Sequence, residues 1–114
     1  MRHEAHKIGK IVDEIVTYFL HGYGAETTMR VTPKADRYEM HFRFDNVSIS
    51  EEEFAELDKL LVVKRQPELE DYYWQLAGEI DTGNELMLIG MMCDELKLSR
   101  DGTTVSLDLV RKVS

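Results

Sequence analysis

Strict alternation of apolar and polar side chains over residues 38–44 is the feature that most constrains this fold. Apolar and polar or charged residues succeed one another without a break, in the order Tyr38, Glu39, Met40, His41, Phe42, Arg43 and Phe44. A period of two is typical of a strand that buries one face and leaves the other in water. The same period returns near the end of the chain, where Val105, Leu107 and Leu109 alternate with polar residues. The chain is therefore predicted to contain an antiparallel sheet with one covered face.

The covering layer is predicted from segments with a helical period. Residues 8–20 place apolar side chains three and four positions apart, at Ile8, Ile11, Val12, Ile15, Phe19 and Leu20. This spacing indicates an amphipathic helix, and Gly22 and Gly24 are expected to end it. A short strand over residues 27–31 and a turn at 33–36 lead into the alternating segment.

The second half of the chain is predicted to be mostly helical before a closing hairpin. Ser50 and Glu53 have the spacing of a capping box, which opens a helix. A further helix is expected over residues 68–77, a buried helix from residue 85 and strands over 96–99 and 103–111. These elements indicate an α+β fold: a two-layer α/β sandwich with helices on one face of a mixed, mostly antiparallel sheet. We expect a single domain over residues 1–114.

Charge and composition limit the classes of partner. Residues 1–49 carry seven acidic and seven basic residues, whereas residues 51–95 carry thirteen acidic residues against three basic ones, a net charge of −10. Such a surface repels phosphates, so nucleic-acid binding is not expected. No apolar run approaches the ~20 residues of a membrane span, and the first residues have no apolar signal-peptide core. With Cys93 as the single cysteine, a cytoplasmic location is expected.

Two segments, DEIVTYFLHGYG (13–24) and FDNVSISEEEFAEL (44–57), carry a family resemblance. Together with Gly83 before a predicted helix and GTT at 102–104, they resemble the histidine-kinase-like (GHKL) ATPase fold, nearest to the anti-sigma-factor serine kinases of bacteria. The resemblance implies that Glu14 stands where the family has its general base. Tyr18 stands where the family has an asparagine that coordinates Mg²⁺. A phenol is a poor ligand for that ion, which prefers compact hard oxygens.

The same resemblance implies that four residues form the part of the nucleotide site that contacts adenine, here called the adenine side. They are Asp45, Asn46, Thr103 and Thr104. In the family the aspartate accepts a hydrogen bond from the adenine amino group, and the threonine contacts the base. The glycines that let the family backbone approach the base are missing, and Val47 takes one of their places. A carboxylate is expected at residue 85, where the family holds phosphate.

These departures favour a degenerate ATPase domain over an active one. We expect a cytoplasmic regulatory or protein-interaction module that has a protein partner, needs no cofactor or metal and does not hydrolyse ATP. One alternative is a divergent anti-sigma-factor-type serine kinase that uses ATP and Mg²⁺, with Glu14 as its base. A second is an unrelated α+β binding module. The sequence does not indicate an oligomeric state.

Plainer interpretations remain beside the family roles. Glu14 fits a solvated helix face, Asp45 fits a turn at a strand end, and both threonines fit a hairpin. The four histidines lack the spacing of a metal site. Three consecutive aromatic residues cannot all be buried on one helix face, so they either fill the former nucleotide cleft or contact a partner. They are Tyr72, Tyr73 and Trp74.

Overall fold

The computed structural model describes residues 4–61 and 85–113 of the chain. Its described strands form one four-stranded sheet in the order β1-β2-β4-β3, and every neighbouring pair is antiparallel. The strands are β1 (Glu26–Pro33), β2 (Arg37–Asp45), β3 (Glu95–Asp101) and β4 (Thr104–Lys112). The prediction of an α+β sandwich is confirmed, although the described sheet is wholly antiparallel rather than mixed.

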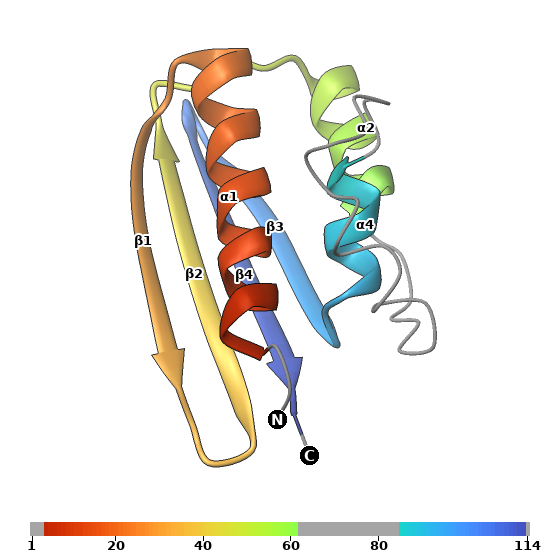
Figure 1. Cartoon of the computed structure of the whole chain (residues 1–114). Helices are drawn as coiled ribbons and strands as arrows, with labels where there is room; N and C mark the ends of the chain where they lie inside the picture. Colours follow the sequence, from red (N-terminus) through yellow and green to blue (C-terminus); the bar gives the residue numbers. More distant parts are fainter. Residues whose placement is uncertain (1–3, 62–84, 114) are drawn as a thin grey trace.

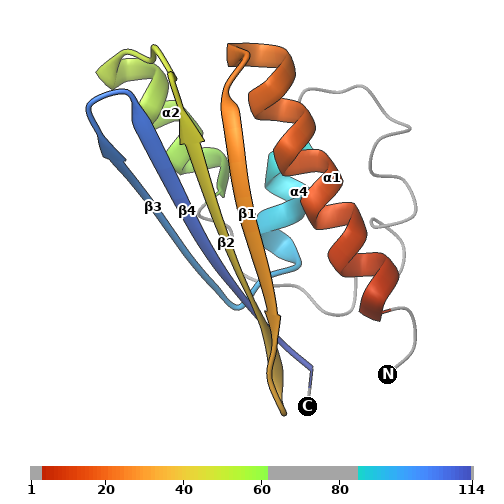
Figure 2. The same cartoon turned by 90° about the vertical axis from the view of Figure 1, so that its left-hand side faces the viewer.

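Three described helices lie on one face of this sheet (Figure 1). They are α1 (Glu4–Tyr23), α2 (Glu51–Leu61) and α4 (Glu85–Met91). The long helix α1 lies over the middle of the sheet and has α4 beside it, whereas the opposite face of the sheet carries no described helix (Figures 1 and 2). The described helices and strands thus make two layers, as the amphipathic patterns require. No described helix has the length and apolar character that crossing a membrane requires.

The core lies between the two layers and contains the apolar residues that the two periods singled out. Its larger buried side chains are Ile8, Ile11, Ile15, Phe19, Met40, Phe42, Phe44, Leu57, Leu61, Leu86, Ile89, Val105, Leu107 and Leu109. The Phe19 and Phe44 rings stack with their centroids 3.8 Å apart, which fixes α1 against β2. One prediction for α1 is wrong: Leu20 is 50% exposed, because it lies at the margin of the apolar stripe.

The ends of the elements follow local rules. The Ser50 hydroxyl accepts a hydrogen bond from the Glu53 N–H at 3.0 Å, and the Glu53 carboxylate accepts one from the Ser50 N–H at 3.1 Å, so the predicted capping box is confirmed. Gly24 ends α1 with a φ of 60° and donates its N–H to the Leu20 carbonyl. Gly102, with a φ of 62°, starts the two-residue turn between β3 and β4.

Strand and helix bounds differ from the predictions at several ends. The first strand reaches from Glu26 to Pro33 rather than 27–31, and the third from Glu95 to Asp101 rather than 96–99. The apolar segment that begins at residue 85 stays helical only to Met91. Cys93 follows that helix and is buried, as expected of a small core residue. The predicted helix over 68–77 and the turn at 81–84 lie outside the described residues.

Candidate functional site

The structure brings the predicted adenine-side residues together at one end of the sheet. Asp45 is the last residue of β2 and Thr104 the first residue of β4, and the pairing of Phe44 with Val105 puts them opposite one another. The Thr104 hydroxyl donates a hydrogen bond to Asp45 Oδ1 at 2.9 Å. Asn46 follows Asp45 with a φ of 63°. The common location of Asp45, Asn46, Thr103 and Thr104 therefore follows from the register of two central strands.

The carboxylate of Asp45 is engaged by the protein itself. Besides Thr104, the Arg43 guanidinium donates from Nε to the same Oδ1 at 3.2 Å. A carboxylate oxygen has two lone-pair directions. Both directions of Oδ1 are thus used, although the Asp45 side chain keeps 28% of its surface exposed.

Val47 stands where the resemblance implies a glycine. Asn46 adopts a left-handed backbone conformation, which Asn tolerates better than most residues. The next residue, Val47, is 1% exposed and belongs to the core. Its N–H donates to the Thr103 carbonyl at 2.8 Å. The segment after β2 is therefore tied to the β3–β4 turn, and the side chain of Val47 is part of the core.

An aromatic cluster stands at the neighbouring end of α1. Tyr18 meets Phe19 edge to face, with ring centroids 5.2 Å apart at 78°, and Tyr23 lies 6.2 Å from Tyr18. All three pack against the core or within it. The position that the resemblance assigns to an asparagine on Mg²⁺ is thus occupied by a phenol inside an aromatic cluster.

Tyr23 is held neutral in this cluster. Burial raises the pKa of Tyr23 to about 12, and the charge of Tyr18, a hydrogen bond with Tyr18 and the charge of Glu53 all act in the same direction. Because the charge of Glu53 acts on Tyr23, the start of α2 lies near this aromatic cluster. The end of α1 and the start of α2 therefore place a neutral aromatic cluster beside a carboxylate.

Glu14, the predicted base, lies on α1 one turn before Tyr18 and is half-buried. Residues four apart on a helix share a flank. Tyr18 interacts with Tyr23, and the charge of Glu53 on α2 acts on Tyr23. The flank of α1 that carries Glu14 and Tyr18 is therefore the one turned toward α2 and α4, which lie beside α1 in Figure 1. The aromatic residues Tyr72, Tyr73 and Trp74 lie outside the described residues, as does Gly83.

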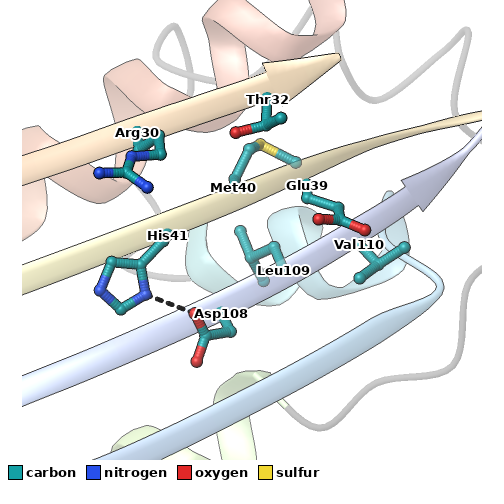
Figure 3. Close-up of a pocket in the computed structure, with 8 residues that line it drawn as sticks. All are labelled: Arg30, Thr32, Glu39, Met40, His41, Asp108, Leu109 and Val110. Carbon is teal, nitrogen blue, oxygen red and sulfur yellow. Dashed lines mark hydrogen bonds and ion pairs between the residues drawn. The ribbon is translucent and has the colours of Figure 1, made fainter. Parts of the chain in front are cut away.

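A second group of polar residues lies farther along the sheet, on the face away from the described helices, at positions that sequence reasoning assigned to no site. It lines a shallow pocket of about 280 Å³ (Figure 3), with Arg30, Thr32, Glu39, His41, Asp108 and Val110 on the outer face. His41 Nδ1 and Asp108 Oδ1 are 2.5 Å apart, and both side chains are about half exposed. Alternation predicts that these residues face outward, but only the strand register sets His41 beside Asp108.

Sequence reasoning also missed a buried charged residue on β4. Arg111 is 1% exposed; it binds the Glu4 carboxylate with Nε and Nη2 at 3.0 and 3.1 Å and the Met92 carbonyl with Nη1 at 2.6 Å. The signal was present, because alternation continued from Leu109 places Arg111 on the covered face of β4. Within residues 4–61 and 85–113, acids, histidines and Cys93 do not gather in a group that could hold a metal ion.

Where β2 ends and β4 begins, the Asp45 carboxylate accepts two hydrogen bonds, and the Val47 N–H donates one to the Thr103 carbonyl. These hydrogen bonds fix the β3–β4 hairpin to the end of β2, and they use both lone pairs of Asp45 Oδ1. Neither models of protein families nor curated proteins match this sequence.

Proposed function

We propose that this chain is a regulatory domain that acts by binding a partner protein and does not hydrolyse ATP. In this proposal it has the histidine-kinase-like ATPase fold, nearest to the anti-sigma-factor serine kinases, with its nucleotide positions taken over by side chains. The observation that carries the proposal is the state of Asp45. Its Oδ1 already accepts hydrogen bonds from Thr104 and Arg43, so the protein itself uses one of the two oxygens that could accept a hydrogen bond from adenine.

Three further features support the proposal that this chain does not bind and hydrolyse ATP. Val47 fills core space where the family backbone approaches the base. Tyr18 packs against Phe19 and Tyr23, and its phenol is a poor Mg²⁺ ligand. The net charge of −10 over residues 51–95 repels a triphosphate. Each of these opposes nucleotide binding by a different physical route, through volume, coordination chemistry and electrostatics.

The partner surface is proposed from the acidic segment 51–81 and the aromatic residues Tyr72, Tyr73 and Trp74. Aromatic side chains are enriched at protein interfaces, and an acidic surface favours a basic partner segment. Because Trp74 is the single tryptophan of the chain, its fluorescence reports on this surface alone.

Isothermal titration of the full chain with Mg-ATP tests the proposal directly. We expect no saturable heat. Micromolar, Mg²⁺-dependent binding that disappears in Asp45→Asn would overturn the proposal and localise the pocket at the end of β2. Ser48→Ala, an exposed change a few residues away, is the matched control and should leave either result unchanged.

A second candidate is the divergent serine kinase, which the partial exposure of Glu14 on the flank facing α2 and α4 favours. It requires phosphate transfer from ATP to a co-expressed protein. Loss of that transfer in Glu14→Ala, with wild-type thermal stability, would establish the kinase and exclude the proposed non-enzymatic role.

A further inference from the structure

The first strand, β1, is the terminal strand of the described sheet, and its outer side is chemically unusual. The Lys34 N–H bonds the Arg37 carbonyl at 2.8 Å, so these two residues close the β1–β2 hairpin as a hydrogen-bonded pair. Hydrogen-bonded pairs alternate along an antiparallel ladder. The backbone groups of Thr27, Met29 and Val31 therefore point away from β2. Pro33 falls in the same set, where its missing N–H leaves the ladder intact.

The two edges of the sheet differ in how they are protected. The opposite edge, β3, carries charged residues at most of its positions, namely Glu95, Lys97, Arg100 and Asp101. Charges of this kind discourage pairing with another strand. Of the eight residues of β1, only Glu26 and Arg30 are charged, and the rest are threonines, apolar residues and Pro33. Of the two edges of the described sheet, β1 is therefore the one whose residues do less to discourage pairing with another strand.

Apolar surface accompanies this edge. Leu20 and Met29 are the large hydrophobic residues that remain exposed in the described part of the chain, each at 50%. Met29 pairs with the buried Phe42, so its side chain is on the helix-covered face. Leu20 continues the flank of α1 that holds the half-buried Val12 and Val16, opposite the flank of Tyr18. This flank is the one turned toward β1, which lies next to α1 in Figure 2.

We propose that β1 pairs antiparallel with β1 of a second copy of this chain, which joins the two sheets into one across a two-fold axis. The register that sets Thr28 opposite the partner's Thr28 also sets Glu26 opposite the partner's Arg30, and Arg30 opposite the partner's Glu26. These residues share the outer face of β1 and are exposed. Opposite charges directly across an antiparallel pair are stabilising. The strand is thus self-complementary in charge.

The same register satisfies the outward backbone and covers the apolar flank. Thr27 and the partner's Met29 become a hydrogen-bonded pair, as do Met29 and the partner's Thr27, because all of these groups point away from β2. The two-fold axis keeps both sets of helices on the same side, so Leu20 and Met29 of each copy approach those of the other. Residues 1–49, which include α1 and β1, carry seven acidic and seven basic residues, so two copies meet through their neutral halves.

This pairing does not depend on the proposed function, since it needs neither nucleotide nor partner protein. A cysteine placed at the two-fold axis tests its register. In non-hydrogen-bonded antiparallel pairs the Cα atoms lie about 4.5 Å apart, within the range that a disulfide spans. Thr28→Cys should therefore form a disulfide-linked dimer under mild oxidation. Ser99→Cys, on the outer face of the opposite edge strand, is the matched control and should stay monomeric on a non-reducing gel. Cys93 is buried in both variants.

Charge reversal tests the same register without a covalent bond. Glu26→Arg and Arg30→Glu each place like charges across the two-fold axis twice, and each should raise the dimer dissociation constant about tenfold. The double variant Glu26→Arg/Arg30→Glu restores opposite charges and should restore wild-type dimerisation. Sedimentation velocity over a range of concentrations measures all four proteins, and circular dichroism verifies their folding. A wild-type chain that stays at 13.3 kDa throughout would overturn the proposal. So would a dimer that ignores both single reversals.

Discussion

At the residue scale, Arg111 is a buried charged side chain whose partners were not predicted from the sequence. It is buried at the end of β4 and bonds Glu4 at the start of α1 and the Met92 carbonyl just beyond α4. One guanidinium thus connects the sheet to two helices. A buried ion pair is weak evidence of net stabilisation, but removing one partner leaves the other charge uncompensated.

We therefore predict that Arg111→Met destabilises the fold by about 3 kcal/mol, because it strands the Glu4 carboxylate and leaves the Met92 carbonyl without its donor. Urea unfolding followed by circular dichroism measures the loss. Arg37→Met is the matched control: Arg37 contacts the carboxylates of Asp36 and Glu39, but its side chain is 37% exposed. The control should change stability far less. Equal losses in the two variants would contradict the role assigned to Arg111.

Tyr23 gives the second residue-scale prediction. Its pKa is raised to about 12 from the ordinary value of 10.0, first by burial and then by Tyr18 and Glu53. Since the folded-state pKa lies above the unfolded one, neutral Tyr23 contributes stability that is fully present below about pH 10. This contribution is lost as the pH rises through about 12.

The phenolate absorbance of the wild type minus that of Tyr23→Phe isolates this ionisation, and its midpoint should lie near pH 12. Tyr18→Phe should lower the midpoint, because it removes both a hydrogen bond and a neighbouring charge. A Tyr23 midpoint at the ordinary value would show that the aromatic cluster is open to water.

At the element scale, the apolar stripe of α1 determines which side of the helix is buried, and two glycines affect its stability and its end. Gly9 lies within α1, on its exposed side, and a methyl group added there meets no atom within 4 Å. Gly24 ends α1 with a φ of 60°, a conformation that a side chain disfavours. The same residue type thus weakens the helix at one position and terminates it at the other.

Gly9→Ala is predicted to stabilise the protein by about 0.5–1 kcal/mol, because alanine loses less conformational freedom in a helix. Gly24→Ala should destabilise it by about 1 kcal/mol, because of the left-handed backbone. Thermal unfolding of the two variants provides the comparison, each serving as the control for the other. Shifts of the same sign would contradict this account of α1.

Elements with a strong local signal were predicted well. The alternation of β2, the stripe of α1 and the capping box of α2 each depend on residues close together in the chain. The end of α4 at Met91 was not predicted, since an apolar run has no period that marks a boundary. There the turn is set by tertiary contacts: the Arg111 guanidinium bonds the Met92 carbonyl, and the Asp94 N–H bonds the Val110 carbonyl.

At the scale of the whole molecule, the sheet order decides which residues meet. β4 lies between β2 and β3, so the last strand of the chain is central. This order brings Thr104 to Asp45 and Asp108 to His41 across long stretches of sequence. It also leaves β1 at an edge, the condition for the proposed pairing of two copies. The uneven charge belongs to this scale too, since the neutral residues 1–49 include that edge.

The sequence by itself determined the two layers, the covered faces of β2 and β4, the capping box and much of the apolar core, because periods of two and 3.6 are properties of neighbouring residues. It also identified Asp45, Asn46, Thr103 and Thr104 as one candidate group. Only the tertiary structure decided that Asp45 is engaged by Thr104 and Arg43, that Arg111 is paired and that β1 is an edge of the described sheet. These depend on strand order and register, which arise from long-range pairing and leave no local pattern in the chain.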